Sequence, residues 1–137
     1  MKVFVYGSLK RGFGNHGLLE WSEFITTTRT KNKNFGMVSL TAFPAVYEGG
    51  TCSIEGELYE VDSTTLFFLD MLEGNGEFYE RQIVELESGD SAWMYCITPG
   101  TISTDSSKHN KVRVKTENSV ETWLPPLDEA EDIFGTE

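Results

Sequence analysis

Glu73 is the residue whose place in the sequence best suits it to acid–base chemistry. It follows a stretch from Thr64 to Leu72 that is long and apolar enough to form a helix. On such a helix Leu66, Leu69 and Glu73 share one face, because positions three and seven residues apart point the same way. Burial on that face and the negative end of the helix dipole both raise the pKa of a carboxyl above its usual value of about 4.3. A carboxyl that titrates near neutrality can act as a general acid and base. The alternative is that the helix frays before Gly74 and that Glu73 reaches water.

A second candidate is the loop Tyr6-Gly7-Ser8-Leu9, which follows the first apolar segment. A glycine there lets the chain turn sharply and approach a ligand closely, and it permits a positive φ. The backbone N–H groups that follow can converge on an anion, and Lys10 and Arg11 add positive charge beside them. Such a loop is suited to a carboxylate or a developing oxyanion. Taken alone, the same four residues are equally consistent with an ordinary turn.

The glycines of residues 12–17 match the spacing of a dinucleotide-binding turn, but their context argues against that function. In dinucleotide-binding folds the glycine turn begins where the strand ends, whereas residues 8–11 intervene here. The acidic residue expected about 20 positions later is also missing, since residues 29–34 contain no acid. We therefore do not expect a nucleotide site.

Nucleophiles and metal ligands are not arranged in any familiar pattern. His16 and His109 lie in unlike regions, and neither Cys52 nor Cys96 has the surroundings of a known nucleophile. The glycine–serine pattern of serine hydrolases is absent, and no ligand spacing indicates a metal site. We expect no metal and no cofactor, histidines with structural or surface roles, and two reduced, buried thiols.

The composition indicates one acidic domain. Its 137 residues match the usual size of a single domain, and 22 acidic against 11 basic residues give a net charge of −11. No Lys or Arg follows Lys115, so we expect a domain over residues 1–115 and an acidic C-terminal segment over residues 116–137. We expect the apolar residues 123–127 to dock that segment partly on the domain, because apolar side chains are costly to leave in water.

The same composition limits the partners that we expect. A chain this acidic repels nucleic acid, and no apolar stretch approaches the roughly 18 residues of a membrane span. The N-terminus lacks the apolar region and cleavage site of a signal peptide. We therefore expect a cytoplasmic protein with neither nucleic acid nor a membrane as partner.

Short strands and two helical segments must position the candidate residues. Strand patterns occupy residues 2–6, 26–30, 35–40, 53–61, 78–87 and 92–98, with a possible edge strand at 111–115. The helical segments are 14–21, which Asn15 could cap, and 64–72, which Asp62-Ser63 could cap. This mixture predicts an α+β fold, with a small mixed or antiparallel β-barrel-like sheet and short helices.

Taken together, the loop and the glutamate resemble a known family. The matching pieces run in the family's order over about the first 98 residues: 3–12 with Asn15-His16, Phe43-Pro44, 54–62, Leu69-Asp70 with Glu73-Gly74, and 79–81. On these residues the chain resembles the γ-glutamylcyclotransferase-like family, most closely its γ-glutamylamine cyclotransferase or AIG2-like branch. The pseudo-dinucleotide glycines fall inside one of these pieces, which removes the nucleotide interpretation.

The resemblance implies a pocket between the loop and the end of the helix. Glu73 would be the catalytic acid and base, and Tyr6, Gly7, Ser8, Leu9 and Tyr79 would bind the substrate. The reaction would release 5-oxoproline and a free amine or amino acid from γ-glutamylamines or small γ-glutamyl peptides. No protein nucleophile or cofactor is needed, because the substrate's own α-amine attacks its γ-carbonyl.

Two alternatives stay open at this point. One is a different amide lyase or acyltransferase that uses the same pocket. The other is a non-catalytic interaction protein that retains the pocket and acts through its acidic C-terminal segment.

Overall fold

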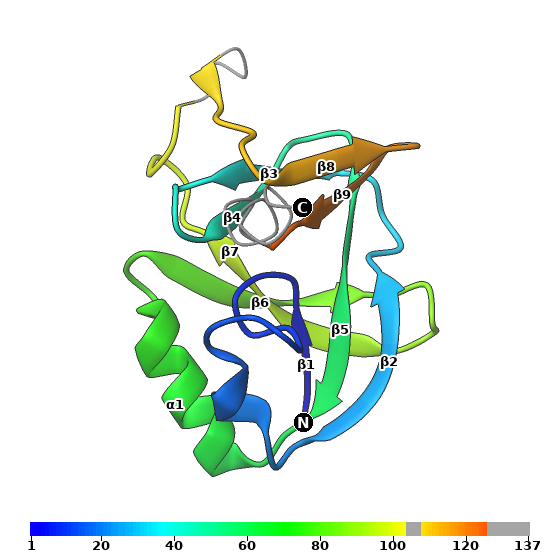
Figure 1. The fold of residues 1–137 in the computed structure, drawn as a ribbon, viewed down its shortest axis with the longest axis vertical. Helices are drawn as coiled ribbons and strands as arrows, with labels where there is room; N and C mark the ends of the chain where they lie inside the picture. The colour runs from blue at the N-terminus through cyan, green and yellow to red at the C-terminus, as the bar shows by residue number, and fades with distance from the viewer. Residues whose placement is uncertain (104–107, 126–137) are drawn as a thin grey trace, which may run out of the picture.

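The computed structural model describes residues 1–103 and 108–125 as an α+β fold in which a single α-helix lies beside a mixed sheet (Figure 1). The fold class expected from the sequence is confirmed. The elements are β1 (Lys2–Val5), the 3-10 helix η1 (His16–Leu19), β2 (Glu23–Arg29), β3 (Phe35–Ser39), β4 (Pro44–Glu48), β5 (Ser53–Glu60), α1 (Ser63–Glu73), β6 (Tyr79–Glu85), β7 (Ser91–Ile97), β8 (Val114–Glu117) and β9 (Val120–Trp123).

The main sheet has the strand order β6-β7-β1-β5-β9-β8, and β2 also pairs with β5. Strand β1 runs antiparallel to β5 and parallel to β7, so the sheet is mixed. A bridge between Thr30 and Leu86 joins the chain just beyond β2 to the chain just beyond β6, which curls the sheet. No complete ring of strand pairs closes a barrel within the described residues. The hairpin of β3 and β4 forms a separate two-stranded sheet.

Strand β1 lies at the centre of the core, and the candidate loop begins at its end. Val3 and Val5 belong to one cluster of buried residues, whereas Phe4 and Tyr6 belong to a second. Because successive side chains of a strand point to opposite faces, this division shows that β1 is buried on both sides. The loop that starts at Gly7 is therefore anchored to a fixed part of the molecule.

Helix α1 begins and ends where its capping residues predict. The Asp62 carboxylate accepts a hydrogen bond from the Thr65 backbone N–H at 2.7 Å. At the other end Gly74 adopts the left-handed conformation with φ 62°, and its N–H donates to the carbonyls of Asp70 and Met71. This cap fixes the last helical residue, Glu73, and thereby sets the direction of its side chain.

The C-terminal hairpin of β8 and β9 is the main departure from the expected elements. The sequence predicts a strand at 111–115, but Arg113 has a φ of 69° and turns the chain, so the strand starts at Val114. Asn118 and Ser119, with φ values of 54° and 61°, form the tight turn between β8 and β9. Strand β9 then pairs parallel with the start of β5.

The expected boundary between residues 115 and 116 falls inside β8, and the sheet continues through β9. Trp123, at the end of β9, is only 1% exposed, as the cost of leaving an indole in water would predict. Residues 126–137, which include most of the expected acidic segment, lie outside the described residues.

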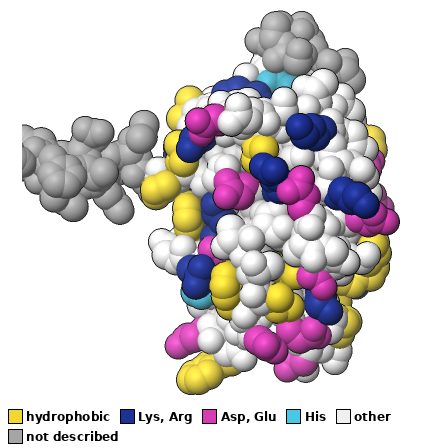
Figure 2. Space-filling model, turned by 90° about the vertical axis from the view of Figure 1, so that its right-hand side faces the viewer, with side chains coloured by type: hydrophobic (Ala, Val, Ile, Leu, Met, Phe, Trp, Pro, Cys, Tyr) yellow, Lys and Arg dark blue, Asp and Glu magenta, His cyan; other side chains and the backbone are white. Residues whose placement is uncertain are grey.

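Charged side chains of both signs are interspersed on the face shown in Figure 2. Arg29 pairs with Glu87 at 2.9 Å and Lys115 with Glu117 at 3.2 Å, and all four side chains are exposed. Exposed pairs of this kind contribute at most about 1 kcal/mol to stability. In the described parts of the chain, no helix has the length and apolar character needed to cross a membrane.

Candidate active site

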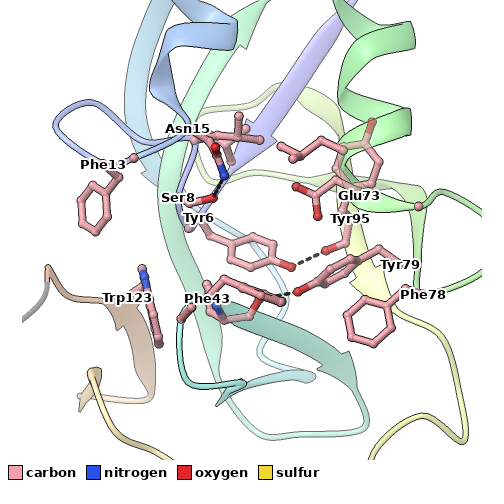
Figure 3. Close-up of a pocket in the computed structure, with 18 of the residues that line it drawn as sticks. Tyr6, Ser8, Phe13, Asn15, Phe43, Glu73, Phe78, Tyr79, Tyr95 and Trp123 are labelled. Atoms are coloured by element: carbon pink, nitrogen blue, oxygen red, sulfur yellow. Dashed lines mark hydrogen bonds between the residues drawn. The ribbon is translucent and has the colours of Figure 1, made fainter.

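A pocket of about 840 Å³ lies between the end of β1, the end of α1 and the C-terminal hairpin. That volume is within the range of small-molecule sites. The structure brings all the expected site residues to its wall: Tyr6, Gly7, Ser8, Leu9, Glu73 and Tyr79 (Figure 3). They come from segments up to 73 residues apart in the sequence, from Tyr6 to Tyr79, so the fold, and not local sequence, assembles the pocket.

Glu73 lies at the pocket wall with its side chain partly buried. Leu66 and Leu69, on the same face of α1, are buried as the helical spacing predicts. Burial raises the pKa of the Glu73 carboxyl to about 7. Within the described residues no group donates a hydrogen bond to this carboxylate, so its proton-accepting oxygens are open to a ligand.

Three tyrosines surround Glu73 in Figure 3. The Tyr6 hydroxyl donates to the Tyr95 carbonyl at 2.5 Å, and the Tyr79 hydroxyl donates to the Pro44 carbonyl at 2.7 Å. Burial is the largest cause that raises the pKa of all three phenols. The Glu73 charge comes next for Tyr79, whereas for Tyr6 it follows the neighbouring Tyr79 and Cys96, and for Tyr95 it follows the hydrogen bond to Asp70. All three phenols therefore stay neutral, and Glu73 is the group in this set that titrates near neutral pH.

The end of α1 is held against the sheet by Asp70. Its carboxylate accepts a hydrogen bond from the Tyr95 hydroxyl at 2.5 Å and another from Arg81 Nε at 2.8 Å. The Arg81 guanidinium also lies over the Trp93 ring, 4.3 Å from its centroid. Because Asp70 is one turn before Glu73, these contacts fix the helix end that presents the Glu73 carboxyl to the pocket.

The loop after β1 is braced by residues that follow it closely in the chain. Asn15 Nδ2 donates to Ser8 Oγ at 2.9 Å, and His16 Nδ1 lies 2.9 Å from the Leu9 carbonyl. The expected cap by Asn15 is wrong, since its side chain makes no capping hydrogen bond to η1 and reaches Ser8 instead. His16 has the structural role that we expected.

Lys10 and Arg11 do not supply positive charge to the pocket, which corrects the expectation for the loop. Lys10 is buried, and its Nζ donates to the Trp123 carbonyl at 2.9 Å. Arg11 lies over Phe24 and pairs with Glu57 at 3.6 Å. Neither side chain lines the pocket.

The loop offers backbone donors instead. The N–H groups of Ser8 and Leu9 make no hydrogen bond to any other part of the chain that the structure describes. Both residues line the pocket, so these donors are available to an oxygen atom of a ligand.

Three further residues line the pocket that were not expected from the sequence: Tyr95, Arg113 and Trp123. Tyr95 looked like one member of an apolar strand, and its hydrogen bond to Asp70 is not visible in a local pattern. The position of Arg113 and Trp123 depends on the pairing of β9 with β5, strands that are about 65 residues apart.

The possible metal ligands and the cysteine thiols are not arranged for catalysis in the described residues. Residues 1–103 and 108–125 contain no group of three or more His, Cys, Asp or Glu side chains placed to share a metal ion. Both cysteines are free; Cys52 is partly exposed rather than buried, and burial raises the pKa of the Cys96 thiol to about 12. A thiol with that pKa is a poor nucleophile at neutral pH.

Gly7→Val is expected to raise KM at least tenfold while the protein still folds. Gly7 does not have a positive φ, so of the two reasons that the sequence suggested only close approach remains. A Cβ at this position would lie 2.8 Å from Cγ of Pro44, which itself lines the pocket. The branched side chain therefore displaces either Pro44 or the loop. Steady-state kinetics together with the thermal midpoint check this, and Gly17→Val is the matched control, since a Cβ there meets nothing within 4 Å and Gly17 does not line the pocket. Unchanged KM would show that close approach at Gly7 does not shape the site.

Comparison with known proteins gives one consistent result. A family model described as gamma-glutamyl cyclotransferase, AIG2-like, matches residues 3–125. The match therefore continues beyond residue 98, where the recognised resemblance ended, and includes the C-terminal hairpin.

Individual relatives agree with the family model. A protein of Methanocaldococcus jannaschii, whose name marks it as a candidate gamma-glutamylcyclotransferase, is 46% identical over 99 residues, which cover 68% of this chain and 81% of the relative. The gamma-glutamylcyclotransferase family protein YtfP of Escherichia coli is 35% identical over 95 residues, covering 69% of this chain and 80% of its own. The crystal structure of an AIG2-like protein from Mus musculus superposes with a TM-score of 0.63 at 30% identity, over 79% of this chain and 82% of that one.

Proposed function

The chain belongs to the AIG2-like gamma-glutamyl cyclotransferase family, and from that premise we propose that it cleaves γ-glutamyl compounds to 5-oxoproline and a free amine or amino acid. The observation that carries the proposal is Glu73, a partly buried carboxyl with a pKa of about 7 at the wall of the pocket. We propose that it is the catalytic acid and base, with Tyr6, Gly7, Ser8, Leu9 and Tyr79 binding the γ-glutamyl group.

The first step forms the ring. The substrate's neutral α-amine attacks its own γ-carbonyl carbon, which makes a carbon–nitrogen bond and places the electron pair of the carbonyl on its oxygen. The Glu73 carboxylate accepts the proton that the attacking nitrogen loses. Attack within one molecule needs only the correct bend of the chain, which a shaped pocket can impose.

The second step breaks the original amide. The oxygen's electron pair re-forms the carbonyl as the bond to the departing nitrogen breaks, and the protonated Glu73 gives its proton to that nitrogen. Glu73 is then again a carboxylate, so one group with a pKa near 7 serves both steps. The unpaired N–H groups of Ser8 and Leu9 are the donors best placed to stabilise the oxyanion in between.

A screen of γ-glutamyl compounds for released 5-oxoproline tests the proposed function. The set should contain γ-glutamyl amino acids and γ-glutamylamines. An α-glutamyl dipeptide is the negative control, because its γ-carboxyl is free and it has no γ-amide to cleave. Release from at least one γ-glutamyl compound and none from the α-glutamyl control is expected. Failure with every γ-glutamyl compound would contradict the proposal.

Removing residues Asp128 to Glu137 is expected to leave kcat/KM within about twofold of its original value. The pocket-lining residues that the structure describes all precede Pro125, and we propose that residues 116–125 act as part of the catalytic domain. Removing the chain from Glu121 onward should instead lower the thermal midpoint, because Glu121 and Trp123 are buried. Loss of activity in the shorter deletion would place the acidic end in the site.

A further inference from the structure

The side of the pocket away from Glu73 is built by the C-terminal hairpin. Figure 3 shows Trp123 across the pocket from Glu73, with the Tyr6 ring between them. The Arg113 guanidinium lies over the Trp123 ring, 4.3 Å from its centroid, and both residues line the pocket. This end therefore combines a cation with a polar aromatic ring.

One donor at this end lacks an acceptor, and a second residue uses only part of its donor capacity. Trp123 is 1% exposed, and its indole Nε1–H is buried without a hydrogen-bond partner. A buried donor left in this state is unfavourable, and most buried polar groups in proteins have a partner. Arg113 donates through Nε to the Leu124 carbonyl at 3.0 Å, but no carboxylate in the described residues pairs with its guanidinium. The site therefore has donor capacity that the protein itself does not use.

Among the described residues that line the pocket, Arg113 is the one Lys or Arg. The Lys10 ammonium donates to the Trp123 carbonyl, and Arg11 forms an ion pair with Glu57. The left-handed backbone of Arg113, with φ 69°, is an unfavourable conformation for a residue with a side chain. It places the guanidinium against Trp123 instead of in a regular strand.

We propose that Arg113 and Trp123 form a subsite for a carboxylate on the leaving group of the substrate. The proposal rests on the proposed function and narrows its substrate class. The preferred substrates are then γ-glutamyl amino acids, in which the departing amine carries a carboxylate, over γ-glutamylamines that have none.

The geometry of ring closure decides which substrate carboxylate reaches this end. The α-carbon of the γ-glutamyl group becomes part of the five-membered ring, so its carboxylate stays beside the reacting centre near Glu73. The leaving group extends from the γ-carbonyl carbon and can reach across the pocket. Arg113 and Trp123 are on the far side, so they meet the leaving group.

A pair of substrates tests the subsite in the unmodified protein. γ-Glutamylalanine and γ-glutamylethylamine differ only in the carboxylate of the departing amine. We expect kcat/KM to be at least about tenfold higher for γ-glutamylalanine, mainly through a lower KM, because the carboxylate gains a charge-assisted hydrogen bond that γ-glutamylethylamine cannot make. Equal values for the two compounds would overturn the subsite and leave the proposed function standing. No 5-oxoproline from either, nor from the wider screen, would instead contradict the proposed function, and the subsite with it.

Variants then assign the effect to the two residues. Arg113→Met should reduce the preference for γ-glutamylalanine to about unity, and Trp123→Phe, which keeps a ring but removes the N–H, should reduce it about threefold. Arg29→Met is the control, since Arg29 is an exposed arginine paired with Glu87 outside the pocket. The preference must be retained in that control, and the thermal midpoints must show that each variant folds. A preference that survives in folded Arg113→Met would overturn the assignment; if that variant does not fold, Trp123→Phe and the substrate pair decide.

Discussion

Glu73→Gln is expected to lower kcat/KM for 5-oxoproline release at least about a hundredfold without loss of the fold. Gln keeps the shape of the side chain but cannot exchange a proton, and removal of a general acid–base group costs 10²–10⁴-fold. In the unmodified protein kcat/KM should fall as the pH drops below about 7, because burial raises the pKa of Glu73 to about 7 and the first step needs its carboxylate. This fall in kcat/KM below pH 7 should be absent in the variant, since Gln does not titrate. pH–rate profiles of the two proteins will test it.

The same substitution is expected to stabilise the protein above neutral pH. The folded pKa of about 7 exceeds the ordinary value of 4.5, so the folded protein binds more protons than the unfolded chain between these two values. The stability that the protonated carboxyl provides is fully present below about pH 4.5 and is lost as the pH rises through 7. Gln carries no charge at any pH, so the variant should gain up to about 3 kcal/mol over the original at pH 8 and little at pH 4.5.

Glu77→Gln is the matched control for both effects, since Glu77 is exposed, is close in sequence and does not line the pocket. It should change neither the rate nor the pH dependence of the thermal midpoint. A Glu73→Gln variant with full activity would remove Glu73 from the mechanism. Lost activity without any gain in stability at pH 8 would mean that the carboxylate is better solvated than its position indicates.

The helix that carries Glu73 could be predicted from the sequence because its determinants are local. Asp62 caps it, Gly74 ends it, and Leu66 and Leu69 mark its buried face. Each of these features acts within a few residues of the helix, and a carboxyl on the buried face has a raised pKa wherever the helix packs. The loop beginning at Gly7 was found for the same reason, since a glycine after a buried strand is a local signal.

The far wall of the pocket could not be predicted, because it depends on long-range pairing. Val112 and Val114 alternate with basic residues and so predict a strand at 111–115, but the left-handed Arg113 displaces the strand. The sequence predicted that Lys10 places its charge at the pocket. In the structure the Lys10 ammonium donates to the Trp123 carbonyl instead. A hydrogen bond across more than 100 residues leaves no periodicity in the sequence.

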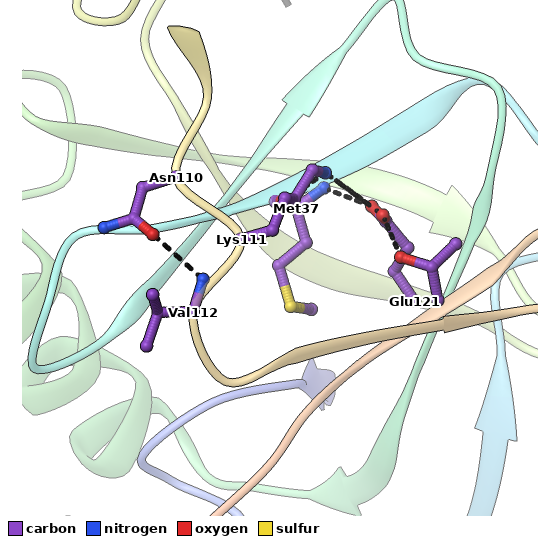
Figure 4. Close-up of polar contacts among 6 residues, drawn as sticks. Met37, Asn110, Lys111, Val112 and Glu121 are labelled. Carbon is purple, nitrogen blue, oxygen red and sulfur yellow. Dashed lines mark hydrogen bonds and ion pairs between the residues drawn. The ribbon is translucent and has the colours of Figure 1, made fainter. Parts of the chain in front are cut away.

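Glu121→Ala is expected to lower the free energy of unfolding by about 2–3 kcal/mol and the thermal midpoint by about 10 °C. Glu121 is 3% exposed, and its carboxylate accepts from the Met37 backbone N–H at 2.7 Å (Figure 4). Lys111 Nζ lies 3.0 Å from the same carboxylate, and the Thr116 hydroxyl donates to it at 2.7 Å. Truncation leaves the Met37 backbone N–H without its acceptor and removes the counter-charge of Lys111, whose ammonium still donates to the Met37 carbonyl.

Glu117→Ala is the control, because Glu117 lies in the same hairpin but its pair with Lys115 is exposed on both sides. Its thermal midpoint should stay within about 2 °C of the original. The double variant Glu121→Leu with Lys111→Met should recover only the part of the loss that comes from Lys111, because the Met37 N–H stays without its acceptor. Equal midpoints for Glu121→Ala and Glu117→Ala would contradict this account of the hairpin. Glu121 holds β9 to β3, and β9 carries Trp123. At temperatures below the thermal midpoint, Glu121→Ala should therefore also discriminate less between γ-glutamylalanine and γ-glutamylethylamine. That result would link the stability of the hairpin to the specificity of the pocket.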